Sequence, residues 1–361
     1  MKTGIYITVL CAFLLTGTNA FAKIWRVNNN GAGTLPLIAA DFATLQAAHD
    51  GAAVGDTLHI EQSPTSYGNC TFTKRLVVIG VGYYLTANPK TQVNKDFTSV
   101  VGALTLVNGA SAGTVITGLT QSAGVAWIIG ANNISILRNR FTYAAGPRIY
   151  LGTGNATPCD GITIQQNSIE GSTSTYAVQT TPGTSGLISN MNVTGNIIAG
   201  AYGFSLGANA SGIFKNNQVS VSYNPINLVN FYVVNNMSYS STSTGNTFDN
   251  CNIEFNMGTV AGHFISPAGS GNIIGTGNVT VAIGGWNLLG GPSPDGQYQL
   301  QASSPAKGAG KSGDDMGAYG GSIPYKLSGM PSVPNIYSMT VDPIPAGATS
   351  IGVTIATKSN N

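Results

Sequence analysis

The stretch that decides the fold is Ile162-Thr163-Ile164-Gln165-Gln166-Asn167, in the middle of the chain. In it an apolar residue precedes an asparagine by three positions, and this pattern recurs on both sides. The pairs are Ile136 with Asn139, Ile164 with Asn167, Val193 with Asn196, Phe214 with Asn217, Val233 with Asn236, and Ile253 with Asn256. Successive asparagines are 28, 29, 21, 19 and 20 positions apart, which is the length that one coil of a solenoid requires.

Asparagine has a physical reason to recur once per coil. It tolerates left-handed backbone at a tight bend, and its amide can bond to the same residue in the coils above and below. The flanking apolar residues alternate, as in Ile134 and Ile136, so they should point into a core. We therefore predict an all-β parallel β-helix with a structural ladder of Asn139, Asn167, Asn196, Asn217, Asn236 and Asn256. Asn278, which lacks the apolar partner, is counted as a degenerate copy.

The ladder makes a prediction about stability. Removing one stacked amide, as in Asn196→Ala or Asn217→Ala, should cost about 1–3 kcal/mol, because neighbouring polar groups lose their partners. The substitution Asn88→Ala lies outside the repeat and is expected to cost much less.

The two ends of the chain differ from the repeat. Asp41 is expected to cap a helix that ends at Gly51 and covers the first coil. After the coils, Pro-punctuated sequence surrounds two strand-like segments, 336–341 and 351–355. We predict four parts: residues 1–22, a signal peptide; 23–100, an N-terminal cap and first coils; 101–325, the β-helix repeats and a closing segment; and 326–361, a C-terminal tail or β-extension.

The first residues have the pattern of a secretory signal. Lys2 supplies the positive start, residues 5–15 an apolar stretch, and Ala20-Phe21-Ala22 a cleavage site. We expect cleavage after Ala22 and a secreted or cell-surface protein. The apolar stretch is shorter than the ~20 residues that a membrane-spanning helix needs, so no transmembrane segment is expected in the mature chain.

Composition narrows the function classes. The chain has 48 Gly and 8% charged residues in 361, which favours turns and β-structure over charged helices. Its net charge of +2 becomes +1 when Lys2 leaves with the signal, since 15 − 1 = 14 basic residues then face 13 acidic ones. That balance argues against a nucleic-acid partner, which requires clustered Lys and Arg. Cys70, Cys159 and Cys251 lack metal-site spacing, so we expect buried, inert thiols and no metal.

Several segments resemble the pectin-lyase-like family of right-handed parallel β-helix proteins, in particular secreted bacterial ones. The resemblance rests on residues 41–48 and 55–60 at the start of the first coil, 74–80 in the next strand, and 304–306 with 315–319 in the closing segment. It covers roughly residues 25–322 and implies a right-handed solenoid. This scaffold hosts unrelated activities, so the resemblance is stronger for fold than for function.

Enzymes of this family usually cleave acidic polysaccharides, and this resemblance implies two possible chemistries. Lyases use Ca²⁺-binding carboxylates with an Arg or Lys base, and hydrolases use paired carboxylates. Both need acidic residues on neighbouring coils. Between Gly102 and Gly290 the acidic residues are Asp160, Glu170, Asp249 and Glu254, and no Gly-His-Gly segment is present. Ca²⁺ is therefore expected only if the chain is a lyase, and otherwise no cofactor.

One group of side chains is a candidate site for an anionic sugar. Arg140, Asp160 and Glu170 are the candidate catalytic residues, and Arg138, Arg148, Tyr143 and Tyr150 the candidate substrate-binding residues. Guanidinium groups can pair with sugar carboxylates, and aromatic rings can stack on sugar faces. The alternative is that all of these are solvated outward positions of a solenoid.

These observations give three functional hypotheses. The first is an exported β-helix that acts as a non-catalytic surface scaffold or carbohydrate-binding module. The second is a polysaccharide lyase or glycoside hydrolase that acts on acidic polysaccharide. The third is a subunit of a cell-surface assembly, suggested by the tail after Pro331. Expected partners are accordingly polysaccharide or cell-surface proteins.

Overall fold

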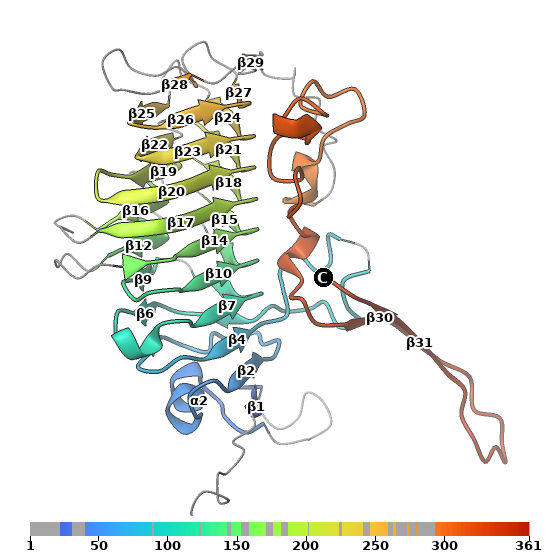
Figure 1. Cartoon of the computed structure of the whole chain (residues 1–361). Helices are drawn as coiled ribbons and strands as arrows, with labels where there is room; N and C mark the ends of the chain where they lie inside the picture. Colours follow the sequence, from blue (N-terminus) through green and yellow to red (C-terminus); the bar gives the residue numbers. More distant parts are fainter. Residues whose placement is uncertain are drawn as a thin grey trace, which may run out of the picture.

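The computed structural model of the chain is a right-handed parallel β-helix (Figure 1). It describes residues 22–30, 40–88, 90–122, 124–142, 146–152, 159–170, 176–181, 187–200, 202–223, 226–240, 246–258, 263–264, 273–274, 279–280 and 293–360. Each coil contributes short strands to three parallel sheets that run the length of the solenoid. The predicted fold class is confirmed. The predicted signal, apart from Ala22, lies outside the described residues, as do Asn278 and Tyr143.

The three sheets follow one another around each coil. The first contains β1 (Ile24–Val27), β2 (Thr57–Ile60), β4 (Val77–Ile79), β7 (Val115–Thr117), β10 (Ser135–Leu137), β13 (Cys159–Asp160), β14 (Thr163–Gln165), β17 (Ile188–Thr194), β20 (Ala210–Lys215), β23 (Phe231–Val234), β26 (Asn252–Glu254) and β28 (Ile273–Ile274). The second contains β5 (Val100–Val101), β8 (Thr120–Gln121), β11 (Arg140–Phe141), β15 (Ser168–Glu170), β18 (Ile197–Gly200), β21 (Gln218–Val221), β24 (Met237–Ser240), β27 (Met257–Gly258) and β29 (Val279–Thr280). The third contains β3 (Cys70–Thr71), β6 (Leu104–Leu106), β9 (Trp127–Ile129), β12 (Ile149–Leu151), β16 (Val178–Thr180), β19 (Phe204–Leu206), β22 (Ile226–Val229) and β25 (Thr247–Asp249).

The core lies between the sheets and is built from columns of equivalent residues. On the first sheet, Ile136 pairs with Ile164, and Ile164 with Val193. These side chains are fully buried, as are Ile134 and Ile162, because every second residue of a strand faces inward. Cys70, Cys159 and Cys251 lie in this core, and none of the three forms a disulfide. Burial raises the pKa of Cys70 to about 12, which keeps it protonated and unreactive.

A short helix covers the first coil, at a different cap from the one predicted. Helix α2 (Leu45–Gly51) begins after Thr44, whose hydroxyl accepts a hydrogen bond from the Ala47 amide. The prediction of Asp41 as the cap is wrong, because its carboxylate instead accepts from the Arg26 amide at 2.8 Å. The helix packs against the first strands at the end of the solenoid (Figure 1).

The repeated asparagines form a buried column at the corner between the first and second sheets. From Asn139 to Asn236, the backbone amide of each donates to the Oδ1 of the asparagine in the next coil. These distances are 2.8 Å for Asn139 to Asn167, 3.0 Å for Asn167 to Asn196, 3.0 Å for Asn196 to Asn217, 2.8 Å for Asn217 to Asn236, and 2.8 Å for Asn236 to Asn256. Each Nδ2 also donates to a backbone carbonyl of the preceding coil, as Asn196 does to Ile164 at 2.8 Å. Each side-chain amide therefore forms hydrogen bonds both with the backbone at the bend and with the asparagine of a neighbouring coil.

One reason given for the asparagines needs correction. We expected them to occupy left-handed backbone, but the left-handed residue is the one before each asparagine. These residues are Arg138, Gln166, Gly195, Asn216, Asn235 and Phe255. Five of the six carry a side chain, for which positive φ is costly unless surrounding contacts hold it. The ladder bonds on one side and the packing on the other provide such contacts.

A C-terminal segment, residues 293–331, runs along the outside of this corner, and we call it the strap (Figure 1). It contains the short 3₁₀ turns η2 (Gly296–Tyr298), η3 (Lys311–Gly313) and η4 (Leu327–Gly329), and η1 (Gly109–Ser111) lies on the solenoid. The strap binds the left-handed residues in turn. Asn235 accepts from the Lys311 amide at 2.7 Å, and Asn216 donates to the Asp315 carbonyl at 3.1 Å.

The strap is anchored through a buried carboxylate, Asp295. It accepts from Asn88 Nδ2 at 2.9 Å and from the Ser328 amide at 2.7 Å. Tyr83 and Tyr325 bond through their hydroxyls at 2.7 Å beside it. The prediction that Asn88→Ala costs much less than a ladder substitution rests on its place outside the repeat, whereas in the structure Asn88 is buried and also donates to Ser328 Oγ.

Beyond the strap, β30 (Asn335–Val341) and β31 (Val353–Lys358) pair as an antiparallel ribbon. This ribbon, residues 335–358, projects away from the solenoid (Figure 1). Its base is fixed, since the Val93 amide donates to the Ile336 carbonyl at 3.0 Å and Arg138 Nη1 donates to the Asn360 carbonyl at 2.9 Å.

Candidate functional site

Two of the candidate site residues meet on the second sheet. Arg140 in β11 and Glu170 in β15 lie on adjacent coils, where Arg140 is aligned with Ser168. The guanidinium donates to Glu170 Oε1 from Nη2 at 2.6 Å and from Nε at 2.9 Å. The two charges therefore neutralise one another.

A tyrosine that the sequence did not single out completes this pair. The Tyr84 hydroxyl donates to Glu170 Oε1 at 3.2 Å, and the Arg140 guanidinium carbon lies 4.6 Å from the centre of the Tyr84 ring. Burial raises the pKa of Tyr84 to about 12, so the phenol stays protonated and can donate. Together with Gln297 and Tyr298 of the strap, these residues line a cavity of about 240 Å³. The cluster ties the strap region to the second sheet and carries no unbalanced charge.

Arg138 and Arg148 lie apart from this pair and are buried. The Arg138 guanidinium bonds to Gln166 and to the Met330 and Asn360 carbonyls, beneath the strap. Arg148 donates to the carbonyls of Gly146, Val125 and Thr142. Burial lowers the pKa of both guanidinium groups. Neither guanidinium is open to a ligand.

Tyr150 and Asp160 point to other faces. Tyr150 lies in β12 of the third sheet, aligned with Ile128 and Gln179. Asp160 enters the first sheet in β13 and accepts from Ser189 Oγ at 2.6 Å and Asn190 Nδ2 at 2.7 Å. These two bonds lower the pKa of Asp160. The described members of the candidate group therefore do not form one site, and Tyr143 lies outside the described residues.

The four carboxylates of the coil region are also dispersed. Glu170 is on the second sheet and Asp249 on the third. Asp160 and Glu254 share the first sheet, but β14, which follows Asp160, is four strands from β26, or about 19 Å at the usual strand spacing. The paired carboxylates of glycoside hydrolases are typically about 5–10 Å apart. These four residues do not supply such a pair.

A larger hollow lies on the outer face of the first sheet. Strands β17 and β20 are locally irregular there, with a shift in register between Ile188 and Met191, and such bulges often re-aim side chains at binding sites. Gly212 is required beside the bulge, because a Cβ at this position would lie 2.2 Å from the Met191 carbonyl oxygen. The irregular pairing and the missing side chain open the surface at this point.

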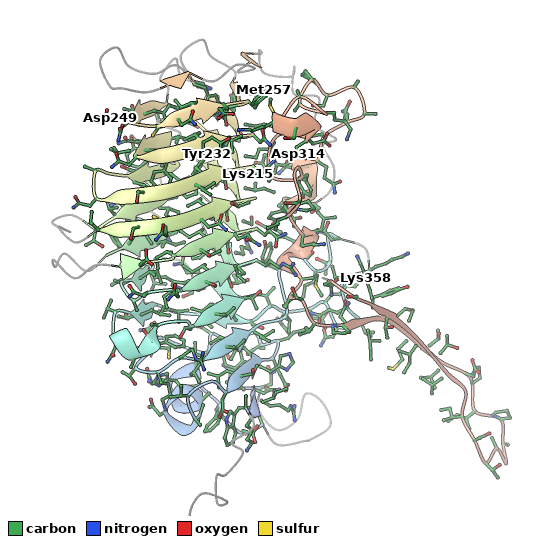
Figure 2. All side chains as sticks on the ribbon, in the orientation of Figure 1. Lys215, Tyr232, Asp249, Met257, Asp314 and Lys358 are labelled. Carbon is green, nitrogen blue, oxygen red and sulfur yellow. The ribbon has the colours of Figure 1, made fainter. Side chains whose placement is uncertain are left out.

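The strap forms the second wall of this hollow, which we call the sheet groove. The groove has a volume of about 490 Å³ and lies between β17, β20 and the strap residues Gly320, Ser322 and Ile323. Its polar lining is made of amide, hydroxyl and ammonium groups, from Asn190, Asn192, Thr194, Lys215 and Asn216. Figure 2 shows Lys215 on the sheet beside the strap.

The sheet groove has a simple electrostatic character. Lys215 is the cation among its lining residues, and that lining contains no carboxylate. Thr194 donates to Asn192 Oδ1, Asn190 donates to Asp160, and Asn216 donates to the Asp315 carbonyl. The lining therefore combines one positive charge, that of Lys215, with polar groups that are held in place by bonds within the protein.

Sequence reasoning missed the sheet groove for a clear reason. Asn192, Thr194 and Lys215 occupy ordinary outward positions of the repeat, and nothing local marks them. The strap residues that complete the groove follow about a hundred positions later in the chain. Gly212 in a strand is the one local signal, since a glycine inside a strand often marks a bulge or close backbone approach.

Comparisons with known proteins give no family assignment: no family model matches the chain, and no curated protein matches it. Within the described residues, no group of three or more His, Cys, Asp or Glu side chains is placed to hold a metal ion. A search of those same residues found no helix that is long and apolar enough to cross a membrane.

Proposed function

We propose that this chain is an exported, non-catalytic β-helix protein of the pectin-lyase-like type that binds a saccharide in the sheet groove. The observation that carries the proposal is the lining of that groove: amides, the hydroxyls of Thr194 and Ser322, and Lys215, with no carboxylate among them. Sugars are bound through many hydrogen bonds to such groups, and a volume near 490 Å³ falls in the usual range for small-ligand sites. The single cation favours a saccharide that carries a carboxylate over a neutral one.

The scarcity and dispersion of carboxylates favour binding over cleavage. Arg140, the base candidate of a lyase mechanism, is paired with Glu170 at 2.6 Å, and Glu254 is paired with Lys311 at 2.8 Å. Cleavage by a hydrolase requires a free acid and a second carboxylate close to one bond. Export and a surface location rest on the signal-like residues 1–22.

Calorimetric titration with a panel of uronate and neutral oligosaccharides tests the proposal. We expect binding of a uronate oligosaccharide that weakens at least tenfold in Lys215→Ala and in Asn192→Ala. Matched controls are Asn252→Ala, an exposed position of the same outward column on the first sheet, and Lys95→Ala, which lies outside the groove. Absence of binding across the panel, or equal losses in the controls, would overturn it.

The same samples test catalysis. Incubation with uronate polysaccharides, with and without Ca²⁺, should yield neither unsaturated products nor new reducing ends. If the chain does cleave the polysaccharide, and this turnover disappears in Arg140→Ala, then the protein is a lyase and the non-catalytic proposal is wrong.

A second candidate function is a subunit of a cell-surface assembly, favoured by the projecting ribbon. The exposed ribbon is anchored to the solenoid at its base. Deleting residues 331–361 should leave the solenoid folded but abolish co-purification of partners. Unchanged co-purification would contradict this function.

A further inference from the structure

The chain is held at three points just before its first strand. β1 is the outermost strand of the first sheet, at the end of the solenoid (Figure 1), and Lys23 directly precedes it. The Lys23 amide donates to Asp56 Oδ1 at 2.8 Å, and the Lys23 carbonyl accepts from the Thr57 amide at 2.8 Å. The side-chain nitrogen of Lys23 lies 3.2 Å from the centre of the Trp25 ring. The first residues of a domain are usually poorly ordered unless they are tied down, and these contacts tie Lys23 to the first coil.

The acceptor of the Lys23 amide, Asp56, is a buried carboxylate. It is 4% exposed, and its Oδ2 accepts from Trp25 Nε1 at 2.7 Å and from the Ala53 amide at 2.8 Å. Burial raises the pKa of Asp56, but the bonds from Trp25, Lys23 and Ala53 outweigh burial and lower the pKa overall. The carboxylate is therefore ionised at neutral pH, while the three nitrogen atoms that donate to it are neutral.

The sequence places a processing site at one of these nitrogen atoms. Ala20-Phe21-Ala22 has the pattern of a signal cleavage site. Hydrolysis of the bond after Ala22 adds one water, which leaves a carboxylic acid on Ala22 and an amine on Lys23. That amine takes up a proton at neutral pH, since an α-amino group has a pKa of about 7.7–8.0. The new positive charge therefore arises on the atom that lies 2.8 Å from Asp56 Oδ1.

We propose that Asp56 is the binding site of the mature N-terminus, so that removal of residues 1–22 turns the neutral bond from Lys23 into an ion pair that closes the first coil. A hydrogen bond between two charged groups is roughly twice as strong as a neutral one. Ala22 is exposed, so its removal takes no buried side chain from the coil. The unprocessed chain should accordingly have a looser first coil than the mature one.

This inference rests on the exported character of the proposed function and does not depend on saccharide binding. A cut at another bond would not produce the pair. A cut after Ala20, for example, would leave Phe21 and Ala22 in place and keep the Lys23 amide neutral. The position of the cut and the strength of the pair are therefore tested separately.

Export of the full chain from a bacterial host, followed by mass spectrometry of the N-terminal peptide, tests the cut. We expect a chain that begins at Lys23 with a free α-amine. A chain that begins elsewhere, or one that keeps residues 1–22, would overturn the proposal. Titration of the same material with saccharides reports separately on the sheet groove.

Hydrogen exchange of the β1 amides tests the ion pair in two chains that are released from an N-terminal fusion, so that export is not needed. One chain begins at Lys23, and the other begins at Ala22 and so keeps a neutral amide at Lys23. We expect exchange at least tenfold faster in the chain that begins at Ala22. All native side chains from Lys23 onward are present in both, so this comparison does not depend on a substitution.

A double-mutant cycle assigns the effect to Asp56. Asp56→Asn should speed exchange of β1 in the chain that begins at Lys23, and the extra Ala22 should then have no further effect. Asp96→Asn, at an exposed position, is the matched control and should leave the tenfold difference intact. Equal exchange in the two native chains, or an unchanged effect of Ala22 in Asp56→Asn, would overturn the proposal.

Discussion

Two neighbouring columns of residues at the same corner of the solenoid behave in opposite ways. The inner column is the asparagine ladder, in which each member is the same residue and bonds to its own copy in the next coil. The outer column consists of the left-handed residues just before it, which differ in type from coil to coil. The outer residues bond mainly to the strap. The inner column therefore stabilises the stacking of the coils on one another. The outer column provides the residues to which the strap binds.

This difference predicts that the strap and the ladder can be disrupted separately. Asp295→Ala should have the largest effect, because it removes a buried charged acceptor of bonds from Asn88, Ser328 and Tyr325. We expect a loss of about 3–5 kcal/mol from the attachment of the strap, seen as rapid proteolysis within residues 293–331 while the coils stay resistant. Asp249→Ala, at an exposed position, is the control. Equal resistance of the strap in both variants would contradict the anchoring role of Asp295.

Alkaline pH should weaken the attachment of the strap. Burial raises the pKa of Tyr83, Tyr319 and Tyr325 above the ordinary value of 10. Their contribution to strap attachment is complete below pH 10 and is lost as the pH rises above it. Between pH 10 and 11 each phenol should remove about 1 kcal/mol, or about 3 kcal/mol together.

Protease sensitivity of the strap, followed from pH 8 to pH 11 together with phenolate absorbance, measures this release. The ladder amides do not titrate, but the buried thiols of the coils do, since burial raises the pKa of Cys70 to about 12. The resistance of the coils is therefore followed in the same samples as a separate signal. Tyr325→Phe should make the dependence on pH shallower. A strap that stays resistant after these tyrosines ionise would contradict the mechanism.

Asn196→Ala and Asn217→Ala should each lower the free energy of unfolding of the coils by about 1–3 kcal/mol, because each leaves buried partners unsatisfied. For Asn217 these are the Asn196 amide and the Val193 carbonyl. Asn252→Ala, at an exposed position on the same sheet, replaces Asn88→Ala as the control. Thermal melts that do not distinguish the three variants would mean that the ladder contributes little.

Arg138→Ala should have the smallest effect, about 1–2 kcal/mol. It removes bonds to Gln166, Met330 and Asn360, but the desolvation that lowers the pKa of Arg138 is relieved at the same time. Arg138→Lys should not restore stability, since a lysine lacks the planar fork. Thermal melts against Arg75→Ala, an exposed arginine, measure the difference. A loss as large as that for Asp295→Ala would place Arg138 at the centre of the strap attachment instead.

The fold was predictable because its signal is local and repeated. Inward residues such as Ile136 and Ile164 alternate within short strands, and the ladder asparagines return at coil spacing. The helix cap at Thr44 and the buried role of Asn88 were not predicted, since each depends on one nearby or distant partner that no repeat reveals. The candidate group around Arg140 was predicted only in part, because adjacent coils brought Arg140 to Glu170 while the corners of the coil turned Tyr150 and Asp160 to other faces.

The sequence by itself determined the solenoid, its inward columns and the ladder, because each follows from contacts between a coil and its next copy at a fixed spacing. The tertiary structure decided everything that involves the strap: the sheet groove, the burial of Arg138 and the anchoring of Asp295. Asp295 and Asn88 are 207 positions apart, and no period in the chain relates them. Contacts of that kind depend on where the closing segment lies against the corner of the solenoid, which no local spacing specifies.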